Sequence, residues 1–484
     1  MQPREVTKMR VKLVFIWLIC LTATLCAETE EKTFSATVEL DGVKVPYKCT
    51  AGFLPIHGEE GKLEASLFYF AYHKENPGSQ AARPVTFCFN GGPGASAVWL
   101  HLGGFGPKRV DIPDVSFPEP PFHYSDNPYS LLDVTDLVFV DPVSTGFSRS
   151  AAGVDPKKFY NVKEDTRVLA DFVRLYVTKN KLWNAPKYLM GESYGGYRIA
   201  MLATYLHDVS YLYLNGLIFI SPAINLQTIM DPNDGNDLPY PLAIPSYTAA
   251  WWYHKKLPNV EEALSKAEAF ALGPYATALL KGDTLTGQEK DKLVEELTHW
   301  SGLSKDYLLR AQFRVLPGAY AHEVFKSSDQ TIGRFDSRYF IPSIYDRKPI
   351  LGSLDPSAEA YLGAFTSAIW MYLEQIGWQT TESYDILSDA SPWDFNQNNQ
   401  YPTAGDKLRN LMTKNPHLRV FVGAGYYDLA TTYESISYSF NHLGLDPSLL
   451  SHLRERHYFA GHMIYLDNKA LPKLKNDLKQ FYSE

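Results

Sequence analysis

The residues best suited to chemistry begin with a serine held between glycines. Gly191-Glu-Ser193-Tyr-Gly195 directly follows the apolar run at residues 188–190 and has the pattern G-x-S-x-G. A serine in this pattern sits on a tight turn from a strand to a helix, which exposes its hydroxyl above the edge of the sheet. Glycines are needed there because the turn brings the strand and helix backbones very close together. A glycine-rich turn around a buried serine is the alternative interpretation.

An acid and a histidine follow Ser193 in the order that a catalytic triad on such a turn requires. Asp428 comes after the apolar run at residues 418–422 and a glycine-containing loop, and His462 comes after a strand pattern at residues 454–459. The imidazole of His462 could then take the proton of Ser193, while Asp428 fixes the tautomer of the ring. His457 is the alternative histidine, but it lies within the strand pattern and is interpreted as structural.

Acyl transfer to a serine also requires hydrogen-bond donors for the oxyanion that forms on the substrate. The turn Asn90-Gly91-Gly92-Pro-Gly94 follows the apolar run at residues 85–89, and its glycines leave backbone N–H groups uncovered. A phosphate-binding loop is the alternative, but no Gly-Lys-Ser/Thr follows these glycines. The turn therefore predicts an oxyanion hole.

These segments each follow a short apolar run without polar alternation, as expected for strands buried on both faces of a parallel sheet. Such runs occur at residues 85–89, 137–140, 188–190, 217–220 and 418–422. Residues 162–176, between two of the runs, have the apolar spacing of a helix. Residues 32–73 instead alternate between apolar and polar side chains, which is typical of antiparallel strands. We therefore predict an α/β fold in which helices flank a mostly parallel central sheet.

The alternation of strands and helices is interrupted between residues 227 and 415. Residues 231–245 are rich in Pro, Asn, Asp and Gly, and helical patterns without a convincing buried strand follow near residues 261–272, 287–300 and 357–376. We interpret residues 227–415 as a mainly helical cap insertion over the active edge of the sheet. The first part of the core would then span residues 28–226 and the second part residues 416–484.

Residues 1–27 are predicted to be a secretory signal peptide. Four basic residues precede an apolar run at residues 13–25, which is followed by Cys26-Ala27 and an acidic start at Glu28. An uncleaved anchor is the alternative, but the run is short for a membrane span. We expect a secreted or periplasmic protein with no stable membrane span after removal of the signal.

Composition limits the kinds of partner and site. The formal net charge is −8, and no basic stripe suited to nucleic acid is present. Outside the signal only Cys49 and Cys88 remain, and they could pair if their geometry allows it. The absence of Cys-x-x-Cys and of a zinc-binding histidine pattern predicts no metal.

Together these motifs resemble those of the serine carboxypeptidases, which have the α/β-hydrolase fold. The resemblance extends from residue 85 to the end of the chain. It depends on segments that occur in order, namely Asn90-Gly-Gly-Pro-Gly94, Phe105-Gly-Pro107, Asp141-Pro-Val-Ser-Thr-Gly-Phe-Ser148, Gly191-Glu-Ser-Tyr-Gly-Gly196, Asp428 and Gly461-His-Met463.

The resemblance implies a catalytic role for five residues. Ser193, Asp428 and His462 would form the triad, and the backbone N–H groups of Gly92 and Tyr194 would form the oxyanion hole. No metal or organic cofactor would be needed. The substrates would be peptides with a free C-terminus.

The resemblance also implies how the substrate is held. Asn90, Gly91 and Glu192 would bind the free carboxylate of the peptide, and Met463 would line the pocket of the departing residue. A carboxylate can accept a hydrogen bond only from a protonated acid, so Glu192 must carry a proton. Burial raises the pKa of such a group and ties its binding function to acidic pH.

The chain departs from the family at two places. Gly103-Gly104 stands where the family carries a second acid, so carboxylate recognition could depend less on low pH or use a cation such as Lys108 or Arg109. Ordinary surface charges are the alternative for this cation pair. Ala95 stands where the family usually has a cysteine, and a chain with few cysteines fits a bacterial-type member.

We therefore predict a serine carboxypeptidase that acts through an acyl-enzyme on Ser193. An esterase or acyltransferase is the alternative, because a triad and an oxyanion hole serve esters equally well. A catalytically inactive binding module is the third possibility, disfavoured because all three triad positions are intact.

Overall fold

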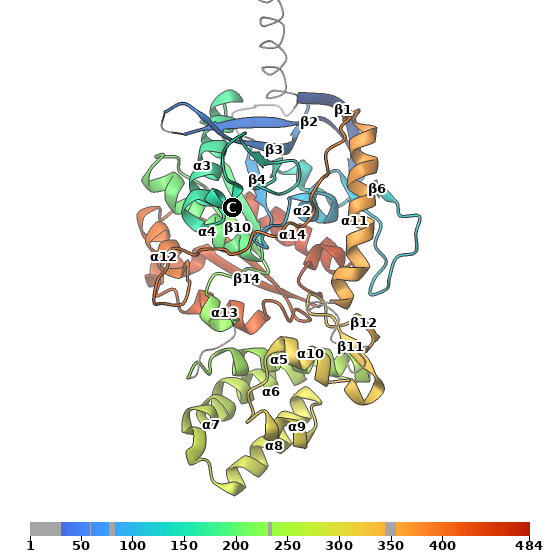
Figure 1. Cartoon of the computed structure of the whole chain (residues 1–484), viewed down its shortest axis with the longest axis vertical. Coiled ribbons are helices and arrows are strands. Elements are labelled where there is room, and N and C mark those ends of the chain that lie inside the picture. The colour runs from blue at the N-terminus through green and yellow to red at the C-terminus, as the bar shows by residue number, and fades with distance from the viewer. Residues whose placement is uncertain (1–30, 59, 77–82, 231–234, 344–354) are drawn as a thin grey trace, which may run out of the picture.

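The computed structural model describes residues 31–58, 60–76, 83–230, 235–343 and 355–484 (Figure 1). The predicted signal peptide at residues 1–27 lies outside these ranges. Among the helices of the described residues, none is long and apolar enough to cross a membrane.

A 10-stranded sheet forms the centre of the molecule, with the order β1-β2-β3-β7-β4-β9-β10-β13-β14 and with β8 paired to β3. Its strands are β1 (Glu31–Leu40), β2 (Val43–His57), β3 (Leu63–Lys74), β4 (Val85–Phe89), β7 (Asp136–Val140), β8 (Arg149–Ser150), β9 (Lys187–Glu192), β10 (Gly216–Ile220), β13 (Arg419–Gly425) and β14 (Leu453–Tyr458). Strands β1, β2 and β3 pair antiparallel, and the strands from β7 to β14 in this order are parallel. The predicted mostly parallel α/β sheet is thus confirmed.

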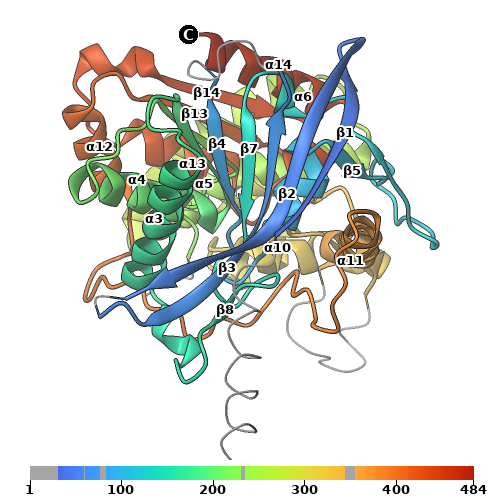
Figure 2. The same ribbon diagram turned by 90° about the horizontal axis from the view of Figure 1, so that it is seen from above.

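Helices cover both faces of the parallel strands. The helices of the described residues are α2 (Val98–Leu100), α3 (Val162–Lys179), α4 (Tyr194–Asp208), α5 (Pro239–Lys255), α6 (Val260–Phe270), α7 (Ala276–Lys281), α8 (Gly287–Ser301), α9 (Lys305–Arg310), α10 (Pro317–Glu323), α11 (Pro356–Gln375), α12 (Gly405–Lys414), α13 (Tyr433–Asn441) and α14 (Ala470–Ser483). Figure 2 shows α3 and α4 on one side of the central strands and α11 on the other. Two short antiparallel pairs, β5 (Lys108–Val110) with β6 (Tyr124–Asp126) and β11 (Gln330–Ile332) with β12 (Phe340–Pro342), lie outside the sheet.

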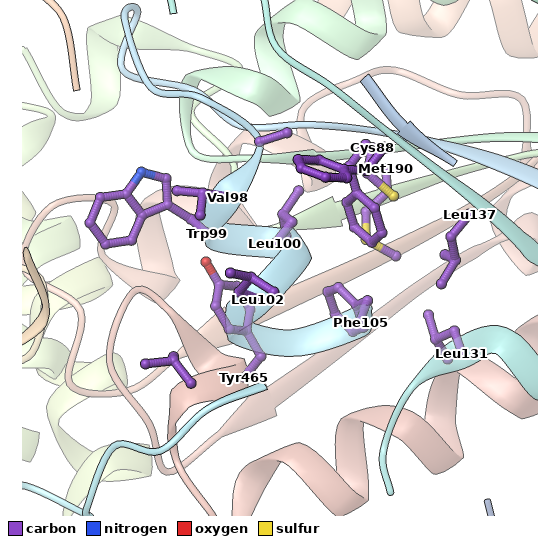
Figure 3. Packing of buried hydrophobic residues seen from close by; sticks show 14 of the residues in the cluster. Cys88, Val98, Trp99, Leu100, Leu102, Phe105, Leu131, Leu137, Met190 and Tyr465 are labelled. Atoms are coloured by element: carbon purple, nitrogen blue, oxygen red, sulfur yellow. The ribbon is translucent and has the colours of Figure 1, made fainter. Parts of the chain in front are cut away.

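Alternate side chains of each parallel strand enter two different cores. In β4, Phe87 and Phe89 pack with residues of α3, α4 and α12, whereas Cys88 packs with residues of α11 and α14. Both faces of these strands are therefore apolar, which explains why the strands appear in the sequence as uninterrupted apolar runs. Figure 3 shows Cys88 and Met190 in the second of these cores, together with Leu100 and Phe105.

The helices α5 to α10, here called the cap helices, have a hydrophobic core of their own. This cluster contains Tyr247, Trp252, Phe270 and Trp300, and it meets the rest of the chain at Leu429. Helix α11 packs instead against the same core as α14, and α12 contacts α4. The proposed cap insertion at residues 227–415 thus contains separately packed helices and segments that cover the sheet (Figure 1).

A hydrogen bond within a group of acidic side chains joins the cap helices to α13. The hydroxyl of Tyr433 donates to Glu268 Oε1 of α6 over 2.8 Å. Burial and the nearby Glu268 raise the pKa of Glu434 to about 7, with Glu455 adding to the effect and His457 opposing it. The folded protein therefore holds a proton on Glu434 at pH values where the unfolded chain has released it. This contribution to stability is complete below about pH 4.5 and is lost as the pH rises through about 7.

We expect Glu434→Gln to reduce the loss of stability between pH 5 and pH 8. The expected change in the pH dependence is on the order of 2 kcal/mol, because a pKa unit is worth about 1.4 kcal/mol and partial solvent exposure reduces the total. Urea unfolding at several pH values would measure it. Glu261→Gln, at an exposed position of α6, is the matched control. An unchanged pH dependence in Glu434→Gln would contradict the prediction.

Candidate functional site

The carboxyl ends of the parallel strands bring the predicted site residues to one edge of the sheet. Ser193 lies between β9 and α4 with φ of 59° and ψ of −127°, a backbone conformation that is strained for a residue with a side chain. A Cβ at Gly195 would lie 2.5 Å from the carbonyl oxygen of Phe89, and a Cβ at Gly191 would collide with the carbonyl of Gly195. The glycines are therefore required for the turn that exposes Ser193.

Asp428 and His462 are in direct contact. Nδ1 of His462 donates to Asp428 Oδ2 over 2.7 Å. The same oxygen accepts the hydroxyl of Thr431 at 2.7 Å, and Oδ1 accepts the backbone N–H groups of Ala430 and Thr431 at 2.7 and 3.0 Å. These hydrogen bonds fix the carboxylate so that Oδ2 faces the imidazole.

The position and charge of His462 are also fixed from other sides. Its backbone carbonyl accepts the hydroxyl of Ser221 at 2.7 Å, and its N–H donates to the carbonyl of Phe335 at 2.6 Å. Burial opposes the imidazolium, but the charges of Asp428 and Glu192 outweigh burial and raise the pKa of His462 above its usual value. The ring is thus able to accept a proton inside the protein.

Ser193 and His462 line a single pocket of about 240 Å³, together with Gly92, Tyr194 and Glu192. In the described part of the chain, no hydrogen bond joins the hydroxyl of Ser193 to His462. Such a bond often becomes short only when a substrate is bound. The pocket therefore brings together a serine hydroxyl, an imidazole and space for a reacting group.

Two predicted oxyanion donors border this pocket. Gly92 has φ of 97°, a conformation that favours glycine, and its N–H finds no backbone acceptor among the described residues. Tyr194 is the first residue of α4, where backbone N–H groups have no acceptor within the helix. A Cβ at Gly91 would lie 2.6 Å from the nitrogen of Tyr194, so a side chain there would cover the donor.

Glu192 is a buried carboxyl group with one satisfied and one unsatisfied oxygen. Its Oε2 accepts Nδ2 of Asn90 and, at 2.8 Å, the hydroxyl of Tyr465. Its Oε1 is buried and has no hydrogen-bond partner among the residues that the structure describes. Burial, with a smaller contribution from Asp428, raises the pKa of Glu192 to about 7, although His462, Tyr465 and Asn90 oppose the rise. Glu192 can therefore carry a proton near neutral pH.

The side chain of Asn90 is held in one orientation. Its Oδ1 accepts the backbone N–H of Leu100 at 3.1 Å, which directs Nδ2 toward Glu192. Its backbone carbonyl accepts the guanidinium of Arg198, which also binds Asp165 at 2.8 Å. Asn90 thus presents its amide from a rigid and fully buried network.

The cations suggested by the sequence do not line the pocket. Lys108 pairs with Asp126 at 2.5 Å. Arg109 donates to the carbonyl oxygens of Gly103, Tyr465 and Leu466 at 3.1 to 3.2 Å. The interpretation of these two residues as carboxylate ligands is therefore not supported by their positions, because both side chains already bind other groups.

Two residues at the site carried no sequence signal. Arg334 lines the pocket and its charge opposes the protonation of His462. Tyr465 contacts Glu192 without lining the pocket itself. Met463, which the sequence did indicate, lines the pocket and is partly buried.

Other candidate residues have different environments. His457 lies in β14 and binds Glu455 at 2.7 Å. Cys49 and Cys88 are both buried and free, so the possible disulfide does not form. Within the described ranges, no group of three or more His, Cys, Asp or Glu side chains is arranged to hold a metal ion.

Comparisons with known proteins show which proteins this chain resembles. A family model described as serine carboxypeptidase matches residues 40–451. A carboxypeptidase Y homolog from Arthroderma benhamiae is 30% identical over 173 residues, which cover 34% of this chain and 31% of that protein. Serine carboxypeptidase-like 36 from Arabidopsis thaliana is 27% identical over 191 residues, which cover 37% and 36% of the two chains. The matched part thus spans about a third of these relatives.

A solved structure has the same fold. The crystal structure of Kex1(delta)p, a prohormone-processing carboxypeptidase from Saccharomyces cerevisiae, aligns with a TM-score of 0.56 and 16% identity. The alignment covers 90% of this chain and 91% of that chain. This likeness, with the sheet order described above, confirms the predicted α/β-hydrolase fold.

Proposed function

Because the chain belongs to the serine carboxypeptidase family, we propose that it removes C-terminal residues from peptides through an acyl-enzyme on Ser193. The single observation that carries this proposal is the buried Glu192, which lines the same pocket as Ser193 and whose Oε1 has no hydrogen-bond partner among the described residues. A triad alone would suit many acyl-transfer reactions. A protonated acid beside the nucleophile suits a substrate that ends in a carboxylate.

In the proposed first step, Oγ of Ser193 attacks the carbonyl carbon of the last peptide bond. Nε2 of His462 takes the hydroxyl proton and later gives it to the departing amine, while Asp428 holds the ring and balances its charge. Water then attacks the acyl-enzyme with His462 acting as base again, and the shortened peptide leaves with a new carboxyl group. The N–H groups of Gly92 and Tyr194 would stabilise the oxyanion in both steps.

Substrate binding and catalysis share a proton in this proposal. The positive charge of His462 lowers the pKa of Glu192, and the negative charge of Glu192 raises the pKa of His462. Each group thus favours the ionised form of the other, and the pair titrates together. When the terminal carboxylate binds, it favours the proton on Glu192. His462 is then neutral and able to act as a base. A substrate with a free carboxylate would therefore promote the protonation state that its own hydrolysis needs.

The test is hydrolysis of an N-blocked dipeptide between pH 4 and pH 8, compared with its C-terminal amide and a simple ester. We expect the free acid to be the best substrate and Ser193→Ala to lower kcat by at least about a thousandfold. Turnover of esters without turnover of the free acid would indicate the alternative esterase or acyltransferase. No turnover and no labelling of Ser193 by a fluorophosphonate probe would indicate an inactive binding module.

Arg334 is expected to influence which terminal residues are preferred. Its exposed guanidinium at the pocket should favour acidic over basic side chains of the substrate. We compare kcat/KM for a peptide ending in Glu with kcat/KM for a peptide ending in Lys. Arg334→Ala should lower this Glu-to-Lys ratio by about fivefold, since a solvated charge pair contributes about 1 kcal/mol. Arg310→Ala, an exposed position in α9, is the control. An unchanged ratio in Arg334→Ala would show that the guanidinium does not contact these side chains.

We also propose that residues 1–27 direct secretion and are removed. In the proposed division, residues 28–226 and 416–484 build the hydrolase core around the site. Residues 227–415 would form the insertion, of which the cap helices have their own hydrophobic core.

A further inference from the structure

A fully buried tyrosine that does not line the pocket supports Glu192. Tyr465 belongs to the short helical segment η10 (Ile464–Leu466), which follows His462 closely in the chain. Its side chain has 0% exposure, and its hydroxyl donates to Glu192 Oε2 over 2.8 Å. Burial and the charge of Glu192 keep the pKa of Tyr465 well above its usual value, so the hydroxyl remains a donor at every working pH.

The space for this ring is created by two adjacent glycines. Gly103 and Gly104 lie in the segment η2 (His101–Phe105). A Cβ at Gly103 would lie 2.6 Å from Cε2 of Tyr465, and a Cβ at Gly104 would lie 2.8 Å from its Cβ and Cγ. Figure 3 shows the ring of Tyr465 packed beside this segment. Any larger residue at either position would push the ring away from Glu192.

Arg109 holds the two segments together. Its guanidinium donates to the carbonyl of Gly103 in η2 and to the carbonyls of Tyr465 and Leu466 in η10. The tyrosine is thus fixed by packing, by its own hydroxyl and by its backbone carbonyl. A side chain with this much support is suited to holding another group in one orientation.

Glu192 is the group that needs an orientation. Asn90 and Tyr465 both donate to Oε2, and within the described part of the chain no group donates to Oε1. A carboxyl oxygen that accepts two hydrogen bonds behaves as the carbonyl oxygen, so the acid proton belongs on the other oxygen. We propose that Tyr465 is a positioning residue that keeps the proton of Glu192 on Oε1, where it can be donated to the terminal carboxylate of a peptide. This inference rests on the proposed function.

The charged and hydrogen-bonding groups that influence the pKa of Glu192 come from several elements. His462 follows β14, Asp428 follows β13 and Asn90 follows β4, while Tyr465 lies on η10 and Arg334 acts through His462. Of the two side chains that donate to Oε2, Tyr465 can lose its donor with almost no change in shape. Loss of that donor leaves the proton free to occupy either oxygen, and it also removes a bond that stabilises the ionised form.

The test is Tyr465→Phe with the dipeptide acid and the simple ester between pH 5 and pH 9. We expect KM for the acid to rise by up to about tenfold at pH 5 to 6, where Glu192 is protonated, as for loss of one hydrogen bond between uncharged groups. The alkaline limb of the acid profile should move up by about one pH unit, while kcat/KM for the ester changes less than about twofold. The Glu192→Gln variant has no acid proton, so adding Tyr465→Phe to it should shift neither limb of the pH profile.

Tyr384→Phe is the matched control, because Tyr384 is also buried and donates to a buried carboxyl group, Asp141, at 3.1 Å outside the pocket. It should leave all these values unchanged. Equal losses on acid and ester in Tyr465→Phe, or an unchanged KM and limb, would overturn the proposed positioning role. A wild-type enzyme that cleaves the ester but not the acid would instead refute the proposed function itself.

Discussion

Replacing Asp428 by Asn is expected to lower kcat by about 10⁴-fold with little change in KM or in the fold. The backbone N–H groups of Ala430 and Thr431 donate to Oδ1, so the carbonyl of the new amide must take this position. The amide NH₂ then replaces Oδ2 and faces Nδ1 of His462. His462 must become an acceptor at Nδ1 and carry its proton at Nε2, where it can no longer receive the proton of Ser193.

Thr431→Val is the matched variant for this experiment. It removes a hydroxyl that donates to Asp428 Oδ2 at 2.7 Å but leaves the carboxylate and the backbone donors in place. We expect a loss in kcat of about tenfold to a hundredfold, in line with one hydrogen bond to a charged group. Steady-state kinetics with the ester would measure both variants. A loss for Asp428→Asn as small as that for Thr431→Val would show that Asp428 does not set the tautomer.

The strands around the site could be predicted because their burial on both faces leaves a direct trace in the sequence. The apolar run at residues 85–89 coincides with β4, and the run at residues 418–422 overlaps β13. The turn after β9 was equally clear, because its tight geometry tolerates only glycine two positions before and two positions after Ser193. In each case one local requirement restricts the residue type, so the requirement can be recognised from a few consecutive residues of the sequence.

The support of Glu192 could not be predicted, because it depends on segments that meet only in the folded chain. Gly103-Gly104 appeared in the sequence as a missing acid, whereas in the structure the two glycines make room for Tyr465. From the sequence, Arg109 was a candidate cation for binding a carboxylate. Only the fold shows that its guanidinium already donates hydrogen bonds to backbone carbonyl oxygens. Helix α11 was predicted as a helix, but its own pattern does not indicate that it packs against the core of the sheet.

The pH dependence of carboxylate binding gives the second large expected effect. Burial raises the pKa of Glu192 to about 7, so the proton needed for binding is present below this value and is lost above it. For one ionisation, activity on the dipeptide acid should fall about tenfold for each pH unit beyond about 7, or about a hundredfold by pH 9. The ester needs no proton on Glu192, and its hydrolysis should persist as His462 becomes neutral.

Glu192→Gln is expected to remove this alkaline loss. Asn90 and Tyr465 would donate to the amide oxygen in the place of Oε2, which turns the NH₂ group toward the pocket as a permanent donor. The variant also removes a charge that raises the pKa of His462, so the acid limb should move to lower pH. The ratio of kcat/KM for acid and ester, measured from pH 5 to pH 9, should then be nearly flat.

Glu434→Gln is the control, since Glu434 also has a pKa raised to about 7 but does not line the pocket. It should keep the hundredfold fall of the wild-type acid-to-ester ratio. Glu192→Ala, which has no donor, should raise KM for the acid at every pH but leave KM for the ester unchanged. If the ratio for Glu192→Gln still collapses above about pH 7, a group other than Glu192 supplies the proton that binds the substrate carboxylate.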